Sequence, residues 1–317
     1  MAEDAVVSAS RGAAITGWGA TLPDKVVTNV DLEATMDTND TWIRERTGIQ
    51  ERRVGGVTSD LAVAAGALAL QSAGVAPHEV DLLILATTTP DQTVPGTSAA
   101  VQDRLGLRCG AFDLNAACSG FAYGLVAANG MVVTGLDKVL VVGAESLSRI
   151  TDYTDRGTGI LFGDGAGAVV VEAIPGEGQL LGWDLGADGS ARSILYADVG
   201  GYIQMEGKEV FRRAVRVMVD SASAAMERAK VTADDIALYV PHQANTRIID
   251  AALSRLGLSL EKTAVNIQRT GNTSSASIPM ALAEAADAGR VSDGDLVLLS
   301  GFGAGMTWAS AVWRWGR

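Results

Sequence analysis

The sequence predicts an α/β protein built from two similar halves, and three observations support this prediction. The chain has 317 residues, which exceeds the usual size of a single hydrophobic core. Apolar runs rich in Val, Ile and Leu alternate with Ala-rich stretches of helical spacing, a pattern typical of sheets whose strands are buried on both faces. The same order of segments also occurs twice, about half a chain apart. We therefore expect one half at residues 1–174 and the other at residues 175–317.

The repeat consists of a helix, a β-rich run, a second helix and a second β-rich run. The corresponding segments are VAPHEVDLLILA (75–86) with VTADDIALYVPH (231–242), RLGL at 104–107 with RLGL at 255–258, and DKVLVVGA (137–144) with GDLVLLSG (294–301). Any two α/β units resemble each other to some degree. Several features that recur in the same order, at offsets from 151 (255 − 104) to 157 (294 − 137), nevertheless favour an internal duplication.

Composition excludes several classes of protein. The net charge of −12 argues against binding to nucleic acid or to an anionic membrane surface. The acidic start, MAEDAVVSAS, lacks the basic and apolar regions of a signal peptide, and no apolar run approaches the roughly 20 residues of a membrane span. Two cysteines and two histidines are too few for a disulfide framework or a structural zinc site. We expect a cytoplasmic protein without a metal site.

Two glycine-rich stretches precede apolar or aromatic residues. In FGDGAGAVVVE (162–172) the glycines lead into a β-branched run, whereas a dinucleotide-binding loop leads into a helix. This stretch is therefore expected to be a tight turn that enters a strand. GFGAGMTW (301–308) follows the predicted strand LVLLS, and its backbone N–H groups could face a ligand or simply form a turn.

Cys118 is the strongest candidate for a chemical role. It lies in NAACSGFAYGL (115–125), directly before a stretch with helical spacing of apolar residues. A thiol at a helix N-terminus is favoured as a nucleophile, although a buried structural cysteine is the alternative.

His242 follows the predicted strand IALYV, at the edge of the sheet where α/β proteins place their sites, whereas His78 lies at a turn. Asn272 lies 154 residues after Cys118 (272 − 118), at a related place in the second half, and could be a turn residue or part of the same site.

Seven segments in order resemble the β-ketoacyl-acyl carrier protein synthase III family of the thiolase superfamily. They are DTNDTWIRERTGI (37–49), AACSGF (116–121), TDRGTGILFGDGAGAVV (154–170), EGKEVFRRAV (206–215), VPHQANTRII (240–249), GNTSSASIP (271–279) and GFGAGMTW (301–308). The resemblance runs from about Ala13 to Trp315. It implies a five-layer αβαβα fold, a homodimer, and a ping-pong Claisen condensation of an acyl-CoA primer with malonyl-acyl carrier protein. Both are substrates, and no cofactor is implied.

The resemblance also assigns a role to each site residue. Cys118 would carry the acyl group, and its backbone N–H, together with that of Ala304, would form the oxyanion hole. Many relatives have glycine where this chain has Ala304, but a backbone contact tolerates that change. His242 and Asn272 would donate hydrogen bonds to the malonyl thioester and stabilise the enolate.

Contacts with coenzyme A and with the carrier protein are likewise implied by the resemblance. The coenzyme A set is Thr38, Trp42, Arg46, Arg156, Phe211, Ala214 and Asn245. The carrier set is Arg212, Arg213, Arg216, Arg247 and Arg255. In the first set Trp42 and Arg156 would hold the adenine between them, since both side chains stack on bases. The second set would steer an acidic carrier, unless its members are only solvated helix faces. Val94 corresponds to a position that closes the primer pocket of the partner subunit, where relatives that take acetyl primers often have an aromatic residue.

Other members of the superfamily resemble the chain less closely. Elongating synthases use a second histidine that this chain lacks, and thiolases use a second cysteine near the C-terminus, whereas Cys109 lies far from there. Plant-type polyketide synthases are longer. Two alternatives remain at this point, namely a relative that transfers an acyl group to an alcohol or amine without decarboxylation, and an acyl-CoA-binding protein without catalysis.

Overall fold

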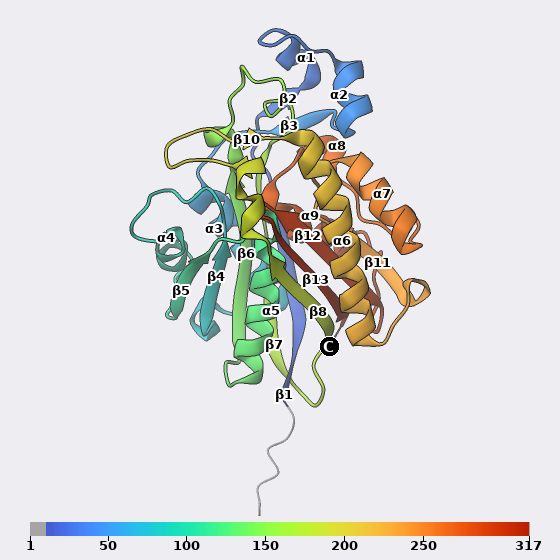
Figure 1. The fold of residues 1–317 in the computed structure, drawn as a ribbon. Helices are drawn as coiled ribbons and strands as arrows, with labels where there is room; N and C mark the ends of the chain where they lie inside the picture. Colours follow the sequence, from blue (N-terminus) through green and yellow to red (C-terminus); the bar gives the residue numbers. More distant parts are fainter. Residues whose placement is uncertain (1–10, 317) are drawn as a thin grey trace, which may run out of the picture.

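Two mixed β-sheets lie face to face with helices between and outside them (Figure 1). The computed structural model describes residues 11–316. The first sheet has the order β1 (Arg11–Thr21), β7 (Asp164–Pro175), β6 (Lys138–Ser146), β4 (Leu82–Ala86) and β5 (Gly110–Leu114). The second sheet has the order β11 (Ile236–Pro241), β12 (Leu296–Gly303), β13 (Thr307–Arg314) and β8 (Leu180–Ala187).

Three layers of helices complete a five-layer αβαβα arrangement. The outer layer on the first sheet contains α3 (Thr58–Ala73) and α4 (Thr97–Arg104), the central layer α5 (Gly120–Val133) and α9 (Ser277–Asp287), and the outer layer on the second sheet α6 (Gly207–Ala229) and α7 (Thr246–Leu256). Side chains of both sheets and of the two central helices form one hydrophobic cluster, which includes Phe121, Leu282 and Trp313. The α/β class and the five-layer fold predicted from the sequence are both confirmed.

A small cap covers one end of both sheets (Figure 1). It contains β2 (Val26–Thr28), α1 (Asn29–Glu33), α2 (Asp40–Thr47) and β3 (Glu51–Arg53), and the short elements β9 (Leu195–Tyr196), β10 (Gln204–Met205) and α8 (Ile267–Thr270) complete the fold. Strand β4 pairs in parallel with β5 and β6, and β11 pairs in parallel with β12. Asn115, His242 and Ala304 directly follow the carboxyl ends of β5, β11 and β12.

The two central helices begin in the same way. Each follows a 3₁₀ turn, η2 (Ala117–Ser119) before α5 and η6 (Ser274–Ala276) before α9. Both turns start at a non-glycine residue with a φ of +48°, Ala117 and Ser274, and the two helices start 157 residues apart (277 − 120). Left-handed backbone at such residues costs free energy and tends to occur at functional sites. The boundary between halves at residue 174 stays a prediction, but the two turns contact each other and are built alike.

Local expectations from the sequence are confirmed at the segments that hold the candidate residues. Helix α5 follows Cys118, β11 precedes His242, and α9 follows Asn272. The glycine-rich stretch at 162–172 leads into a strand and not into a helix, as expected, but the expected turn is short, because β7 already begins at Asp164 and includes Gly165 and Gly167. Among residues 11–316, no helix is both long enough and apolar enough to cross a membrane.

Candidate active site

Two cavities meet at Cys118. The larger, of about 530 Å³, is lined by Cys118, His242 and Asn272 together with residues of α2, α6 and α7. The smaller, of about 320 Å³, is lined by Cys118 and Ala304 and by apolar side chains such as Leu147 and Ile150. The three residues singled out from the sequence therefore border one space, and the thiol also borders a second.

Cys118 lies in the 3₁₀ turn that leads into α5, directly after the strained Ala117. The end of β12 comes very close to this turn, because a Cβ atom on Gly303 would lie 2.5 Å from the backbone nitrogen of Cys118. Burial raises the pKa of the Cys118 thiol to about 12, and the negative charge of Glu145 adds to the effect, while the side chain of Ser274 opposes it. The resting thiol is therefore protonated at neutral pH.

His242 lies directly after β11 and is 1% exposed. Its backbone N–H donates to Ser300 at 2.8 Å, and its ring packs edge-on against Phe302 with ring centroids 5.4 Å apart. The Nδ1 atom lies 2.6 Å from the hydroxyl oxygen of Ser277. Burial lowers the pKa of His242 to about 3, so the imidazole is neutral at physiological pH.

Asn272 is held by its backbone and by its side-chain oxygen. Its N–H donates to Leu161 and its carbonyl accepts from Gly163, both at 2.9 Å. Its Oδ1 accepts a hydrogen bond from the N–H of Ser274 at 2.9 Å. Because a backbone N–H can only donate, the atom facing Ser274 must be the oxygen, and the NH₂ group is left to donate elsewhere. Asn272 therefore offers a neutral donor at the cavity that it lines.

Glu145 is a buried carboxylate beside this site that the sequence analysis did not single out. It is the penultimate residue of β6 and is 0% exposed. Its oxygens accept from the hydroxyl groups of Thr87, Thr88, Thr89 and Ser275 and from the N–H of Thr88. Burial raises the pKa of Glu145, and these hydrogen bonds oppose the shift. The available signal was its position directly after the run VLVVGA, where a charged residue interrupts an otherwise apolar strand.

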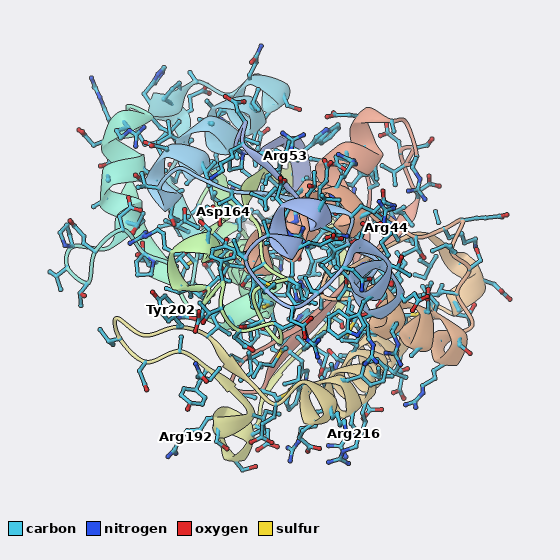
Figure 2. The ribbon with its side chains drawn as sticks, turned by 90° about the horizontal axis from the view of Figure 1, so that it is seen from above. Arg44, Arg53, Asp164, Arg192, Tyr202 and Arg216 are labelled. Carbon is cyan, nitrogen blue, oxygen red and sulfur yellow. The ribbon has the colours of Figure 1, made fainter. Side chains whose placement is uncertain are left out.

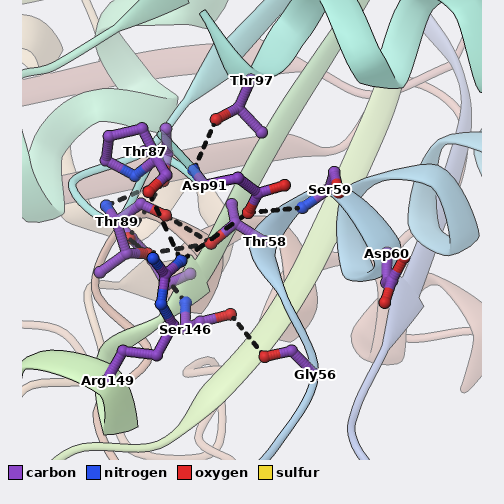
Figure 3. Close-up of polar contacts among 12 residues, drawn as sticks. Gly56, Thr58, Ser59, Asp60, Thr87, Thr89, Asp91, Thr97, Ser146 and Arg149 are labelled. Carbon is purple, nitrogen blue, oxygen red and sulfur yellow. Dashed lines mark hydrogen bonds and ion pairs between the residues drawn. The ribbon is translucent and has the colours of Figure 1, made fainter. Parts of the chain in front are cut away.

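Thr89 links the Glu145 carboxylate to the start of the loop at residues 87–97. Its hydroxyl donates to Glu145 at 2.7 Å and accepts from the N–H of Ser146 at 2.8 Å. Figure 3 shows Thr89 beside Thr58 and Ser146, and the Thr58 hydroxyl donates to the Thr89 carbonyl at 2.6 Å. The start of the loop is therefore fixed, whereas Val94, farther along it, is 82% exposed and does not line either cavity at Cys118.

The residues expected to bind coenzyme A fall into two groups. Trp42, Arg46, Phe211 and Asn245 line the larger cavity. Thr38, Arg156 and Ala214 do not line it, and Ala214 is fully buried on α6. Two guanidinium groups nevertheless lie over the Trp42 ring, that of Arg156 at 4.7 Å and that of Arg46 at 5.2 Å from the ring centroid. The Trp42 ring and these two guanidinium groups therefore form one aromatic and cationic cluster, from which Trp42 and Arg46 line the cavity.

The arginines expected to meet a carrier protein differ in their pairing. Arg212 and Arg213 both bind Glu209, with nitrogen–oxygen distances of 2.7 and 2.6 Å, and Arg212 lowers the pKa of Glu209 to about 2. Arg247 lines the larger cavity, and its guanidinium lies 5.7 Å from the centroid of the Phe211 ring. Arg216 and Arg255 are exposed and form no ion pair with residues 11–316. Figure 2 shows Arg216 at the outer edge of the molecule.

The fold and the cavity define a class of protein. Two solved structures match almost the whole chain. The 3-oxoacyl-[acyl-carrier-protein] synthase III from Aquifex aeolicus VF5 has a TM-score of 0.94 and 46% identity, and covers 96% of this chain and 100% of its own. The corresponding synthase from Thermus thermophilus has a TM-score of 0.91 and 49% identity, with 96% and 99% coverage. The protein is therefore a condensing enzyme of the thiolase fold.

Sequence comparison narrows this class to one family. Two family models match, one described as 3-oxoacyl-[acyl-carrier-protein (ACP)] synthase III at residues 112–189 and the other as its C terminal at residues 226–315. A relative from Geobacillus kaustophilus, named beta-ketoacyl-[acyl-carrier-protein] synthase III, is 50% identical over 312 residues, which cover 96% of this chain and all of that relative. The chain belongs to the 3-oxoacyl-[acyl-carrier-protein] synthase III family, also called β-ketoacyl-acyl carrier protein synthase III.

Proposed function

We propose that the protein condenses an acyl-CoA primer with malonyl-acyl carrier protein through an acyl-cysteine intermediate. The observation that carries the proposal is that Cys118, His242 and Asn272, which come from three separate segments, line one cavity. One nucleophile and two neutral hydrogen-bond donors are the groups that a decarboxylative condensation needs. Membership of the family supports the same reaction.

In the first half-reaction, the sulfur of Cys118 attacks the thioester carbonyl of the acyl-CoA. The new bond joins the Cys118 sulfur to the acyl carbon, the bond from that carbon to the coenzyme A sulfur breaks, and the thiol proton ends on the released coenzyme. The backbone N–H groups of Cys118 and Ala304 would stabilise the tetrahedral oxyanion. The acyl chain would occupy the smaller, apolar cavity, and the coenzyme the larger one, with its adenine against Trp42.

In the second half-reaction, the malonyl thioester loses CO₂ and its enolate carbon attacks the acyl-cysteine. Negative charge develops on the thioester oxygen as the carbon–carbon bond to the carboxylate breaks. The Asn272 NH₂ group and the neutral His242 ring would donate to that oxygen. The Cys118 sulfur then leaves and takes up a proton, and the product is a β-ketoacyl thioester on the carrier protein. No cofactor takes part in this scheme.

We further propose that the protein acts as a homodimer in the cytoplasm. Strand β5 lies at the edge of the first sheet, and its Phe112 side chain is 38% exposed. An open edge strand with an exposed aromatic side chain favours pairing with a second copy of the chain. The exposed Val94 loop would then reach the primer cavity of the partner subunit. The carrier protein would contact Arg216, Arg247 and Arg255, which form no ion pair with residues 11–316, more than Arg212, because Glu209 neutralises Arg212.

Product analysis tests the proposal against its alternatives. The purified protein is incubated with acyl-CoA and malonyl-acyl carrier protein, and the carrier is examined by intact mass spectrometry. We expect a β-ketoacyl carrier and one CO₂ released for each coenzyme A. Acyl transfer to an added alcohol or amine without CO₂ would indicate the acyltransferase alternative. Acyl-CoA binding without any acyl-cysteine would indicate a protein that does not catalyse either step.

A further inference from the structure

Ser277 is a buried hydroxyl at the site that the proposed reaction does not yet use. It is the first residue of α9 and is 1% exposed. Its Oγ lies 2.6 Å from the Nδ1 atom of His242 and 3.3 Å from the backbone nitrogen of Gln243. The segment that contains Asn272 thus also supplies the polar partner of the histidine ring.

The direction of the bond between Ser277 and His242 follows from counting donors and acceptors. A serine hydroxyl has one hydrogen and two lone pairs. The Gln243 N–H can only donate, so it occupies a lone pair of the Ser277 oxygen. Among residues 11–316, Nδ1 of His242 is the one acceptor within hydrogen-bond distance of this hydroxyl. If Nδ1 carried a proton, the buried hydroxyl hydrogen would have no acceptor, which is costly inside a protein.

This count determines where the imidazole proton is. The ring is neutral because burial lowers the pKa of His242 to about 3, so it has a single N–H. If Nδ1 accepts from Ser277, the ring proton must be on Nε2. At the cavity that His242 lines, the ring then provides the Nε2–H group as a donor, and Nε2 has no free lone pair.

We propose that Ser277 is a positioning residue that holds His242 in the tautomer with its proton on Nε2, so that the ring donates to the malonyl thioester oxygen. The inference rests on the proposed function for its catalytic meaning, but the tautomer itself does not depend on it. Asn272 is oriented by the same principle, because the Ser274 N–H occupies its oxygen and leaves its NH₂ group to donate. Two neighbouring serines of one motif would thus set both donors.

The tautomer can be observed directly, because the chain has only two histidines. Protein labelled with ¹⁵N-histidine gives two sets of ring signals in a long-range ¹H–¹⁵N correlation spectrum, and His78→Gln, at an exposed position, identifies those of His242. We expect an unprotonated Nδ1 and a protonated Nε2 in the wild-type protein. A protonated Nδ1 would overturn the inference whatever the activity of the enzyme. If the protein failed to condense at all, the proposed function would fail while this spectrum still tested the tautomer.

A kinetic measurement tests whether the hydroxyl matters for the second half-reaction. In Ser277→Ala we expect condensation by the preformed acyl-enzyme to slow by about 10-fold or more, since complete loss of one such donor costs roughly 10²–10³-fold. Acylation by acyl-CoA should change by less than about 3-fold on the same scale. Ser277→Thr keeps a hydroxyl and should recover most of the rate. Ser310→Ala is the matched control, because it removes a buried hydroxyl that contacts Ser300 at 3.0 Å and lies outside both cavities. Equal slowing of both half-reactions in Ser277→Ala would contradict a role in setting the donor.

Discussion

Replacing Asn272 by aspartate changes the proposed donor and little else. The backbone bonds of residue 272 to Leu161 and Gly163 do not involve its side chain. One carboxylate oxygen of the aspartate can still accept from the Ser274 N–H, which now lies 2.9 Å from Oδ1. The other oxygen takes the place of the NH₂ group. The substitution therefore preserves the turn, removes one hydrogen-bond donor, and places negative charge where the enolate forms.

The magnitude follows from the cost of a lost oxyanion donor, about 10²–10³-fold in rate or roughly 2.7–4 kcal/mol. Repulsion between the carboxylate and the enolate adds to that loss, so we expect Asn272→Asp to slow condensation by about 10³-fold or more. Acylation of Cys118 should be nearly unchanged, because that step does not form the enolate.

The assay separates the two half-reactions. Acyl-enzyme is formed with excess acyl-CoA, freed of coenzyme by gel filtration and mixed with malonyl-acyl carrier protein, and the loss of the acyl mass is followed by quenched-flow mass spectrometry. Acylation is measured separately on the free enzyme. If Asn272→Asp slowed both half-reactions equally, or slowed condensation by less than about 10-fold, Asn272 would not be the donor of the account.

Four other results are expected. Cys118→Ser should abolish acylation by acyl-CoA, whereas Cys109→Ser should leave it nearly intact, as judged by intact mass. Trp42→Ala should raise the KM for acyl-CoA by about 5- to 150-fold, the range for losing one base stack, with a smaller effect on kcat. Val94→Phe should shift the preference among primers towards acetyl-CoA by roughly 10-fold, measured by competition between acetyl-CoA and a branched acyl-CoA, and an unchanged preference would exclude this residue as the end of the pocket. Because the pKa of His242 is lowered from 6.5 to about 3, the condensation rate of the acyl-enzyme should not fall between pH 8 and pH 5 through protonation of this ring; a loss of rate with a midpoint near 6.5 would show that the ring titrates normally.

Local patterns predicted the α/β class and the candidates Cys118 and His242, whereas the five-layer fold and the role of Asn272 came from the family resemblance. The alternation of β-rich and Ala-rich runs predicted strands β4, β6, β11 and β12, because each is buried on both faces and therefore apolar along its length. Cys118 and His242 could be found because each follows the carboxyl end of a predicted strand, β5 for Cys118 and β11 for His242, although the two strands belong to different sheets. The ion pairs of Glu209 with Arg212 and Arg213 were not predicted, although the motif EVFRR contains the signal, since residues three and four apart lie on one face of a helix.

The remaining features depend on contacts between distant segments. Glu145 binds Thr89, 56 residues earlier, and Ser275, 130 residues later, and no local pattern indicates either partner. Ser277 reads as an ordinary helix residue until α9 brings it to His242, which lies 35 residues before it. Val94 is exposed in the single chain, so its proposed role needs a second copy that the sequence of one chain does not describe.

The acyl-cysteine intermediate is tested most directly with isolated acyl-enzyme and malonyl-acyl carrier protein labelled with ¹³C in the free carboxyl group. The acyl-enzyme is freed of acyl-CoA before mixing, so any acyl group in the product must come from Cys118. We expect the label to appear as ¹³CO₂ in a one-to-one ratio with the acyl group lost from Cys118, and the carrier to gain an unlabelled β-ketoacyl group. Loss of the acyl group without ¹³CO₂, or retention of the label on the carrier, would contradict the claim that Cys118 hands its acyl group to a decarboxylating malonyl thioester.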